Sequence, residues 1–359
     1  MTALRLLLVG PLPPPAGGMA NQTRQLGQLL SAEGLRVTLV QTNAPYQPAW
    51  IGGVPVLRAL FRLVPYLARL WRGIAGADVV HVMANSGWAW HLFAMPAIRI
   101  AKARRRAVVV NYRGGLAAEF LARSARSVAA TLSDTRLAVP SAFLQQVFRR
   151  HGIESVIIPN VVDVERFRPG TLPQHLAPAA PHVVIARNLE PVYGIDLGLR
   201  ALALVAQRFP GLRASIAGTG PELEYLGALA GALGIADRVR FTGRLDAHEM
   251  VRLYQSADLV LNPSRADNTP NSILEALACG VPVVSTDVGG IPFLVEHGRS
   301  AWLAPVESPE ALAHGVCEVL TNPQLRDTLV ASGLELARSC AWTNVRAQWL
   351  GTYREVMAT

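Results

Sequence analysis

The stretch "SRADNTPNSILEALACGVPVVSTDVGG", residues 264–290, decides the fold of this chain. It follows the apolar run "DLVLNP" (258–263), carries a helical pattern through its middle, and contains a second apolar run, "VPVVST" (281–286). Strands of continuous apolar character, each followed by a helix, are typical of a parallel sheet that is covered on both faces. The stretch therefore predicts a strand–helix–strand unit of an α/β domain.

The same alternation runs along most of the 359 residues. In the first half, the expected strands are 4–10, 35–42, 77–83, 107–112, 135–140 and 154–160. The pattern restarts at residue 182, with expected strands in "HVVIAR", "LRASIAG", "RVRFTG", "DLVLNP", "VPVVST" and "SAWLAP". We therefore predict an α/β protein of two Rossmann-like, doubly wound parallel-sheet domains in series. Ligands of such sheets bind beyond the carboxyl ends of the strands, so a site is expected in those loops.

A proline- and alanine-rich segment, "RFRPGTLPQHLAPAAP" (166–181), interrupts the pattern and is typical of a linker. The final helical pattern has no strand after it, so we expect it to pack back toward the first domain. The expected division is a first domain over 1–168, a linker over 169–181, a second domain over 182–340 and a terminal helix within 341–359.

The composition narrows the class of protein. Hydrophobic residues make up 51% of the chain and charged residues 16%, which favours a large core over disorder. The three cysteines include no close pair, so we expect reduced thiols and neither disulfides nor a zinc site. No uninterrupted apolar stretch reaches the ~20 residues of a membrane span, and the apolar run at the start is too short for a signal peptide. A cytoplasmic protein is expected.

The positive charge is concentrated in the first half. Residues 1–160 hold 18 Lys+Arg against 5 Asp+Glu, a net charge of +13, whereas the remainder holds 16 against 20, a net charge of −4. This asymmetry favours an anionic partner for the first half. Lys102 is the only lysine, so a phosphate site must use arginine, asparagine or backbone N–H groups.

Residues 54–73, "VPVLRALFRLVPYLARLWRG", form the clearest amphipathic segment. At 100° per residue, four arginines (Arg58, Arg62, Arg69, Arg72) fall in a sector of about 80°, opposite a leucine face. A basic amphipathic helix with aromatic residues suits peripheral contact with the inner face of the plasma membrane, and "RIAKARRR" (99–106) adds charge. A helix that covers the sheet with a solvated basic face is the alternative. Nucleic acid is not expected as a partner, because no recognition motif accompanies the charges.

Three predicted loops at carboxyl ends could hold an anion. Gly17 and Gly18 precede a helix, where free N–H groups suit a phosphate or a sugar hydroxyl. Arg113, in "NYRGG", closes the fourth strand, and we expect its guanidinium to point into the cleft between the domains. Arg187, in "ARNLEPVYG", ends the first strand of the second domain and can neutralise a diphosphate bidentately. Each also has a plainer interpretation, as a strand–helix turn or a surface arginine.

The stretch 264–290 contains two acids, Asp267 and Glu275, that are eight residues apart. We expect Pro270 near the first position of a helix, with an asparagine or threonine as its cap. Glu275 then lies about one turn inside that helix, whereas Asp267 lies in the loop before it. Carboxylates accept hydrogen bonds from vicinal diols, so each acid could hold one sugar ring. The alternative is purely structural: Asp267 caps the helix, and the charge of Glu275 interacts favourably with the helix dipole.

The chain resembles the retaining glycosyltransferases of family 4, which have the GT-B fold of two Rossmann-like domains facing a cleft. The resemblance is strongest over residues 264–295, which are similar to the family's Glu-x7-Glu region. "PPPAGGMA", "VPSAFLQQVFRRHGI", "IIPNVVDVERF" and "AGTGPELEYL" support it. It implies transfer of a sugar from a nucleotide diphosphate with retention of configuration, without a metal or other cofactor. The first domain would lie on the acceptor side, and the second would bind the nucleotide sugar.

The resemblance also implies roles for individual residues. Glu275 would bind the ribose and Asp267 would position the donor sugar, whereas Arg187 would clamp the diphosphate near Gly17 and Gly18. Arg113 takes the place of a histidine that belongs to the catalytic set. The remaining donor contacts would come from the helix start and the base pocket: Asn268, Thr269, Pro270, Asn271, Ser272, Arg244 and Leu245.

Three positions depart from the family pattern. Asp267 stands where the first glutamate is usual, Tyr193 replaces a lysine that accompanies the arginine, and Arg113 replaces the histidine. Either the clamp is rearranged, with Arg113 or Arg265 supplying the missing charge, or activity is impaired.

The leading hypothesis is a glycosyltransferase that acts on a glycan or lipid-linked acceptor at the cytoplasmic membrane face, in cell-surface polysaccharide or glycolipid synthesis. A sugar-nucleotide epimerase of the same fold and a catalytically weak nucleotide-sugar-binding protein are the alternatives. The donor sugar, its base and the acceptor are left open.

Overall fold

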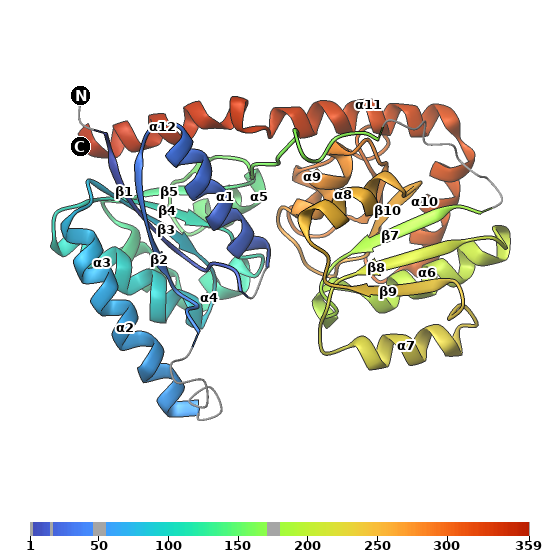
Figure 1. Cartoon of the computed structure of the whole chain (residues 1–359), viewed down its shortest axis with the longest axis horizontal. Coiled ribbons are helices and arrows are strands. Elements are labelled where there is room, and N and C mark those ends of the chain that lie inside the picture. Colours follow the sequence, from blue (N-terminus) through green and yellow to red (C-terminus); the bar gives the residue numbers. More distant parts are fainter. Residues whose placement is uncertain (1–2, 15–16, 46–54, 171–179, 359) are drawn as a thin grey trace. The chain divides into compact units, whose positions relative to one another are not determined.

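The computed structural model describes residues 3–14, 17–45, 55–170 and 180–358, with the backbone alone for 55–60. It contains two compact units, each built on one sheet (Figure 1). The first unit comprises Met1–Val161 together with Val345–Thr359, and the second comprises Val162–Asn344.

The first sheet has six parallel strands in the order β2-β1-β3-β4-β5-β6. All six expected strands of the first half are present, although the last is short. Their order reverses direction between β1 and β3, which is the switch point where ligands of such sheets bind. The strands are β1 (Arg5–Gly10), β2 (Arg36–Gln41), β3 (Val79–Ala84), β4 (Ala107–Tyr112), β5 (Arg136–Val139) and β6 (Val156–Ile157).

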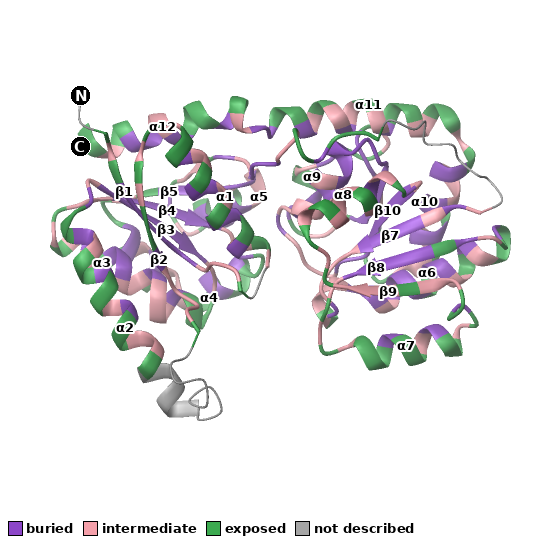
Figure 2. Cartoon of the chain, in the orientation of Figure 1, coloured by how far each residue is buried: buried purple, intermediate pink, exposed green. Residues whose placement is uncertain are grey.

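Helices cover both faces of this sheet, so its central strands are buried (Figure 2). One face packs against α2 (Pro55–Ala75), α3 (Met95–Ala103), α4 (Ala117–Leu132), α5 (Ala142–Arg149) and a π-helical turn at Trp90–Ala94. The other face carries α1 (Gly18–Ala32) and the terminal helix α12 (Trp342–Ala358). His81, on β3, contacts that terminal helix through a 2.8 Å hydrogen bond between its Nδ1 and the Tyr353 hydroxyl.

The second sheet is also parallel, with the order β12-β11-β10-β7-β8-β9. All six expected strands of the second half are present. This order reverses direction between β7 and β10. The strands are β7 (His182–Ala186), β8 (Arg213–Ala217), β9 (Val239–Gly243), β10 (Leu259–Asn262), β11 (Val283–Thr286) and β12 (Trp302–Ala304).

Two hydrophobic clusters form the core of the second unit, one on each face of its sheet. The first lies under α6 (Ile195–Arg208), α7 (Leu223–Ala232) and α10 (Pro309–Thr321). The second lies under α8 (Ala247–Gln255), α9 (Asn271–Ala278) and α11 (Pro323–Ser339). The predicted α/β class, with two doubly wound sheets, is confirmed.

The boundary between the two units lies after Val161, earlier than the expected boundary at residue 168. The difference has a packing cause. Val162 and Phe167 are buried in a core cluster of the second unit, and the Val162 N–H donates to the Cys340 carbonyl at 3.1 Å. Most of the expected linker, 171–179, lies outside the described residues.

The amphipathic segment forms α2, and its buried side includes Tyr66, Leu70 and Ile74. The helix therefore covers the sheet, as the second of the two interpretations predicted. Pro65 lies inside the helix. Three large apolar side chains on α2 stay exposed, by 46% for Phe61, 55% for Val64 and 53% for Trp71. No helix in the described ranges is long and apolar enough to cross a membrane.

Candidate functional site

The predicted donor residues gather where the second sheet changes direction. Arg187 follows β7, and the loop 263–270 follows β10, its neighbour in the sheet. The loop leads into α9, which carries Glu275. Because the carboxyl ends of parallel neighbours meet at one edge, residues far apart in the sequence become one site.

A glycine turn after β11 fixes this loop. The Gly290 N–H donates to the Asp267 carbonyl at 3.0 Å. A Cβ at Gly289 would collide with that same carbonyl oxygen, and one at Gly290 with the carbonyl of Asn268. Gly289 also has φ +56°, a conformation that favours glycine. The "DVGG" segment is therefore needed for the backbone position of Asp267.

Arg187 is held from three sides. Its Nε donates to the Asn262 Oδ1 at 2.7 Å, and its Nη2 donates to the Asp267 Oδ2. Its guanidinium lies 5.3 Å from the centroid of the Tyr193 ring. Tyr193 therefore adds no positive charge where the family has a lysine, but its ring is placed to orient the arginine.

Asp267 forms an ion pair with Arg187, in which the two side chains are only 14% and 12% exposed. Its other oxygen, Oδ1, accepts from the Asn268 N–H at 2.8 Å. The Ser264 hydroxyl also lies 3.5 Å from Oδ2. The acid expected at the donor sugar thus neutralises the arginine expected at the diphosphate.

Glu275 lies in the second turn of α9, separate from Asp267 as predicted. The Tyr254 hydroxyl donates to its Oε2 at 3.3 Å. Burial raises the pKa of Glu275 to about 7, although Tyr254 and Arg187 oppose the shift. This carboxyl therefore changes its charge near neutral pH.

The start of α9 differs in detail from the expectation. Pro270 occupies the N-cap itself, and no side chain caps the helix. Asn271 and Ser272 follow as its first helical residues, and the buried Asn268 and half-buried Thr269 precede it. Proline has no side-chain oxygen to offer the first turn, so the expected asparagine or threonine cap was wrong.

Arg265 does not provide a spare positive charge. It donates to both oxygens of Asp196, at 2.7 and 2.8 Å, and its Nε donates to the Glu307 Oε1 at 2.6 Å. Hydrogen bonding to Asp196 raises the pKa of Arg265 above its ordinary value. Two carboxylates and the Pro191 carbonyl, which accepts from Nη1 at 3.1 Å, thus saturate this guanidinium.

Arg244 and Leu245 follow β9, one strand further from the switch point than β8. Arg244 is exposed and Leu245 is half-buried. They lead directly into the N-cap of α8, Asp246, whose side chain accepts from the N–H groups of His248 and Glu249. The base-pocket assignment of this pair rests on the resemblance.

The remaining predicted residues belong to the first unit. Gly17 is the N-cap of α1 and Gly18 its first residue, with no side-chain cap and no acid in the first turn. Arg113 follows β4 and donates from Nε to the Asn111 Oδ1 at 3.1 Å. Its Nη1 donates to the Gln22 Oε1 at 3.2 Å and to the Asn160 Oδ1.

Sequence reasoning missed several supporting residues. Asn262, which orients Arg187, is buried at the end of β10, and Asp196 lies in the first turn of α6. Asn262 is visible in the sequence as a polar residue in an otherwise apolar strand, whereas no local pattern links Asp196 to a residue 69 positions away. The role of the two glycines of "DVGG" in placing Asp267 was also missed.

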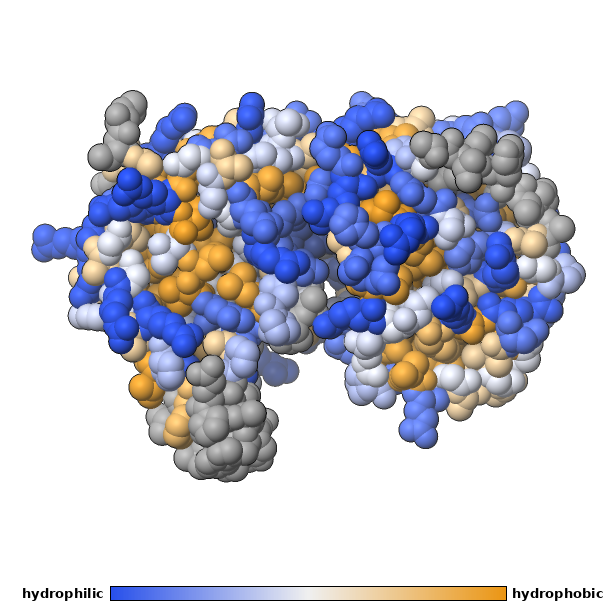
Figure 3. Space-filling view, in the orientation of Figure 1, coloured by the Kyte–Doolittle hydropathy of each residue, from blue (hydrophilic) through white to orange (hydrophobic). Residues whose placement is uncertain are grey.

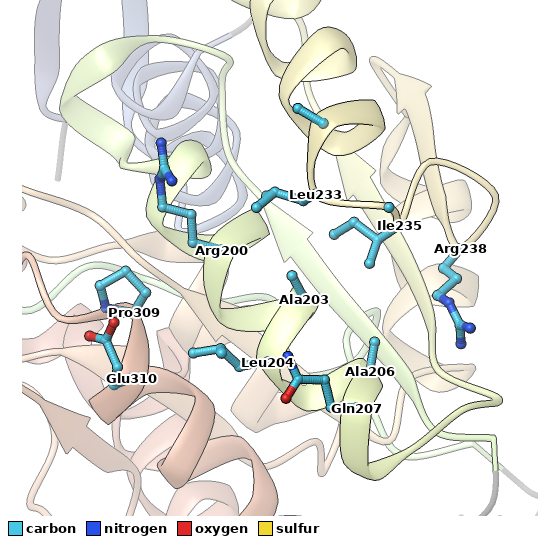
Figure 4. Close-up of a pocket in the computed structure, with 12 residues that line it drawn as sticks. Arg200, Ala203, Leu204, Ala206, Gln207, Leu233, Ile235, Arg238, Pro309 and Glu310 are labelled. Carbon is cyan, nitrogen blue, oxygen red and sulfur yellow. The ribbon is translucent and has the colours of Figure 1, made fainter.

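A surface hollow of about 580 Å³ lies elsewhere in the second unit (Figure 4). It is lined by residues such as Arg200, Leu204 and Gln207 from α6 and by Arg238. It includes none of the predicted site residues. Within the described ranges, no group of three or more His, Cys, Asp or Glu is arranged to hold a metal ion.

Two family models match the chain. The one described as Glycosyltransferase Family 4 matches residues 16–166, and the one described as Glycosyl transferases group 1 matches residues 174–335. Two structures show the same fold over almost the whole of both chains. Sucrose-phosphate synthase from Thermosynechococcus elongatus has a TM-score of 0.76 at 20% identity, covering 99% of each chain. Anabaena HepE with UDP-glucose has a TM-score of 0.75 at 22% identity, covering 98% of this chain and 99% of that one.

Curated relatives match over shorter lengths. A D-inositol 3-phosphate glycosyltransferase from Saccharomonospora viridis is 36% identical over 55% of this chain and 49% of its own. A phosphatidyl-myo-inositol mannosyltransferase from Mycobacterium tuberculosis is 32% identical over 62% and 59%. The chain thus spans about half the length of the first of these relatives. A GDP-mannose-dependent mannosyltransferase from Mycobacterium tuberculosis is 28% identical over 96% of this chain and 94% of its own. Together with the two matching models, these findings place the chain in the group 1, family 4 glycosyltransferases, whose GT-B fold it has.

Proposed function

We propose that this chain transfers a sugar from a nucleoside-diphosphate sugar to a hydroxyl group of an acceptor, with retention of anomeric configuration. One observation carries the proposal. Arg187, Asp267 and Glu275 are brought together at the switch point of the second sheet, where a nucleotide ligand of such a fold binds. Family membership and the transferase names of the relatives support it.

In the proposed reaction, the bond between the anomeric carbon and the diphosphate oxygen breaks. Arg187 stabilises the negative charge that develops on the departing diphosphate. The acceptor oxygen bonds to the anomeric carbon on the face that the diphosphate leaves, and the acceptor proton passes to the departing phosphate oxygen. No residue of the chain needs to be oxidised or covalently modified.

The other two residues position the donor. Glu275 accepts hydrogen bonds from the ribose hydroxyls, which favour its ionised form, and Asp267 accepts one from a hydroxyl of the sugar. The Tyr193 ring keeps the guanidinium of Arg187 oriented. We also propose that transfer needs no metal, so activity should survive a chelator such as EDTA.

The test is nucleotide release from the purified chain, with and without a sugar acceptor. UDP-, GDP- and ADP-sugars are first screened by thermal shift, because a ligand that binds only the folded state raises its stability. Acceptor-dependent release, with a product of unchanged anomeric configuration by NMR, supports the proposal. Epimerisation without an acceptor, or binding without turnover, overturns it in favour of an epimerase or a binding protein.

We further propose that the chain works on a lipid-linked or glycan acceptor at the inner face of the plasma membrane, with α2 touching the lipid. Phe61, Val64 and Trp71 are exposed within one stripe of this helix at 100° per residue. Arg72 and Arg69 lie along one side of the stripe, and the Arg104 guanidinium lies 3.8 Å from the Trp71 ring centroid. Figure 3 shows hydrophobic surface beside hydrophilic surface on the described part of this helix.

Such a surface fits an anionic lipid layer, because apolar and cationic side chains lie together. Vesicle flotation tests this placement with phosphatidylglycerol against phosphatidylcholine at low salt. We expect binding to the anionic vesicles alone, and the double variant W71S/R72Q should lose most of it. Arg123→Gln, an exposed arginine of α4, is the matched control for charge. Equal flotation with neutral lipid, or no flotation, removes the membrane from the proposal.

A further inference from the structure

The carboxyl edge of the first sheet carries a polar cluster around one arginine. Arg113 follows β4, Asn160 follows β6, and Gln22 lies in the second turn of α1, which follows β1. Asn111, at the end of β4, completes the set, which we call the Arg113 cluster. Three of its members are almost fully buried: Asn111 is 1% exposed, Asn160 5% and Gln22 7%.

The hydrogen-bond partners of Arg113 among the described residues are all neutral. Nε donates to Asn111 Oδ1, and both Nη1 hydrogens are taken by Gln22 Oε1 and Asn160 Oδ1. In the described part of the chain, no carboxylate forms an ion pair with Arg113. Burial lowers the pKa of Arg113 to about 10, which still leaves it charged at neutral pH. A buried cation without a counter-charge is costly unless a ligand compensates it.

The hydrogen bonds leave a defined part of the guanidinium for a ligand. Within the described part of the chain Nη2 donates to no acceptor, so its two N–H groups are available. With Nε and Nη1 occupied, a fork of two parallel bonds to a planar carboxylate cannot form. A tetrahedral phosphate has several acceptor oxygens, so one oxygen can accept from Nη2 while the others accept from neighbouring donors.

The surroundings favour the same ligand. The N-terminus of α1, which supplies Gln22, has no side-chain cap and no acid in its first turn. Its N–H groups and helix dipole favour an anion close to Arg113. The Nδ2 of Asn111 is buried with no hydrogen-bond partner within the described ranges, so the cluster is not saturated by the chain itself.

We propose that the Arg113 cluster binds a phosphate group carried by the sugar acceptor. The assignment to the acceptor rests on the proposed function, in which the donor diphosphate belongs to Arg187 in the other unit. The anion site itself stands on the geometry of the first unit. Arg113 is then a specificity-determining residue that restricts the acceptor to phosphate-bearing molecules.

Calorimetric titration of the full chain tests the site directly. The probes are glycerol 1-phosphate and uncharged glycerol, each added with and without a saturating concentration of the nucleoside diphosphate that the thermal-shift screen selects, taken here as UDP, so that binding at Arg187 is separated from binding at Arg113. We expect only the phosphate to bind with UDP present. Arg113→Met should weaken this binding by about tenfold or more, and Arg113→Lys by less, because it keeps the charge. Arg123→Met, an exposed arginine of α4, is the matched control and should bind like the parent.

The outcomes separate this inference from the proposed function. Phosphate binding that depends on Arg113 supports the site even if no sugar is transferred, in which case only the proposed function fails. Unchanged phosphate binding in both Arg113 variants overturns the site. Loss of UDP affinity in Arg113→Met, equal to the loss of phosphate affinity, also overturns it, because Arg113 would then contact the donor.

A second arm distinguishes the source of the phosphate. Flotation is repeated with vesicles of phosphatidylglycerol in phosphatidylcholine, with soluble glycerol 1-phosphate as competitor. Competition that Arg113→Met abolishes supports a lipid headgroup. Binding of the soluble ester without any effect of Arg113 on the vesicles supports a soluble phosphorylated acceptor.

Discussion

The two sheets use arginine in opposite ways at their carboxyl edges. In the first unit, Arg113 is held by amide oxygens alone. In the second, Arg187 is paired with Asp267, and Arg265 with Asp196 and Glu307. The same contrast holds for the whole units. The first carries 20 Lys+Arg against 6 Asp+Glu, a net charge of +14, and the second 14 against 19, a net charge of −5.

This difference predicts different responses to an anion. At Arg113, an arriving phosphate meets a cation with no counter-charge, so no ion pair has to break. At Arg187, an arriving diphosphate must displace or share the Asp267 carboxylate, which lowers the net affinity but leaves that carboxylate available to a sugar hydroxyl. Donor binding would then change the partners of both residues: Arg187 would bind the diphosphate, and Asp267 would accept from the sugar hydroxyl instead of from Arg187.

Replacing Arg187 should have the largest effect. Arg187→Met removes the donor-site cation that pairs with Asp267, so kcat/KM for the donor should fall by about 100-fold or more. Steady-state nucleotide release measures this. Arg200→Met, an exposed arginine on α6, is the matched control and should leave the rate almost unchanged. A loss below about threefold would show that the diphosphate charge is stabilised elsewhere.

The second largest effect should come from the charge of Glu275, because the pKa of this residue is raised to about 7. A ribose hydroxyl donates to the ionised carboxylate, so donor affinity should rise as the pH increases through 7. Below that value, the affinity should fall by up to about tenfold per pH unit. Isothermal titration with the preferred nucleotide between about pH 5.5 and 8 gives the profile. Glu275→Gln should bind more weakly by about tenfold and lose the pH dependence. A parent profile that is flat over this range would contradict the ribose role.

Acid should affect the stability of the two units in opposite directions. Burial lowers the pKa of His81, in the first unit, to about 3, so the unfolded chain takes up its proton first. The free energy of unfolding therefore falls by up to about 1.4 kcal/mol per pH unit below about 6.5. For Glu275 the folded state holds the proton more tightly. The contribution of Glu275 to the free energy of unfolding therefore rises, by up to a similar amount per pH unit, as the pH falls from about 7 toward 4.5.

Urea unfolding of variants separates these two effects. His81→Asn should flatten the acid-side loss of stability, and Glu275→Gln should steepen it, because the opposing contribution of the second unit is removed. Both are compared with the parent at several pH values by fluorescence. If the two variants change the slope in the same direction, one of these pKa shifts has the wrong sign.

Much of the architecture could be predicted from the sequence because its signals are local. Continuous apolar runs separated by helical patterns predicted all twelve strands of the described residues, and the loop–helix placement separated Asp267 from Glu275. The ion pairs could not be predicted, because Arg265 reaches Asp196 only through the fold. The same is true of Arg113, whose three amide partners come from three separate segments. Local pattern identified each arginine, but only the tertiary structure shows which of them is already neutralised.

The smallest effect is expected from lengthening the acid at position 267. Asp267→Glu restores the residue usual in the family and keeps the charge that pairs with Arg187, so turnover should change by no more than a few-fold. Asp267→Asn keeps the shape but releases Arg187 from its counter-charge. Affinity for free UDP should then rise while sugar transfer falls, because the sugar hydroxyl loses its charged acceptor. Calorimetry with UDP and a transfer assay measure the two quantities. If the Asn variant loses UDP affinity, Asp267 does not compete with the diphosphate, and the contrast with Arg113 reduces to a difference in packing.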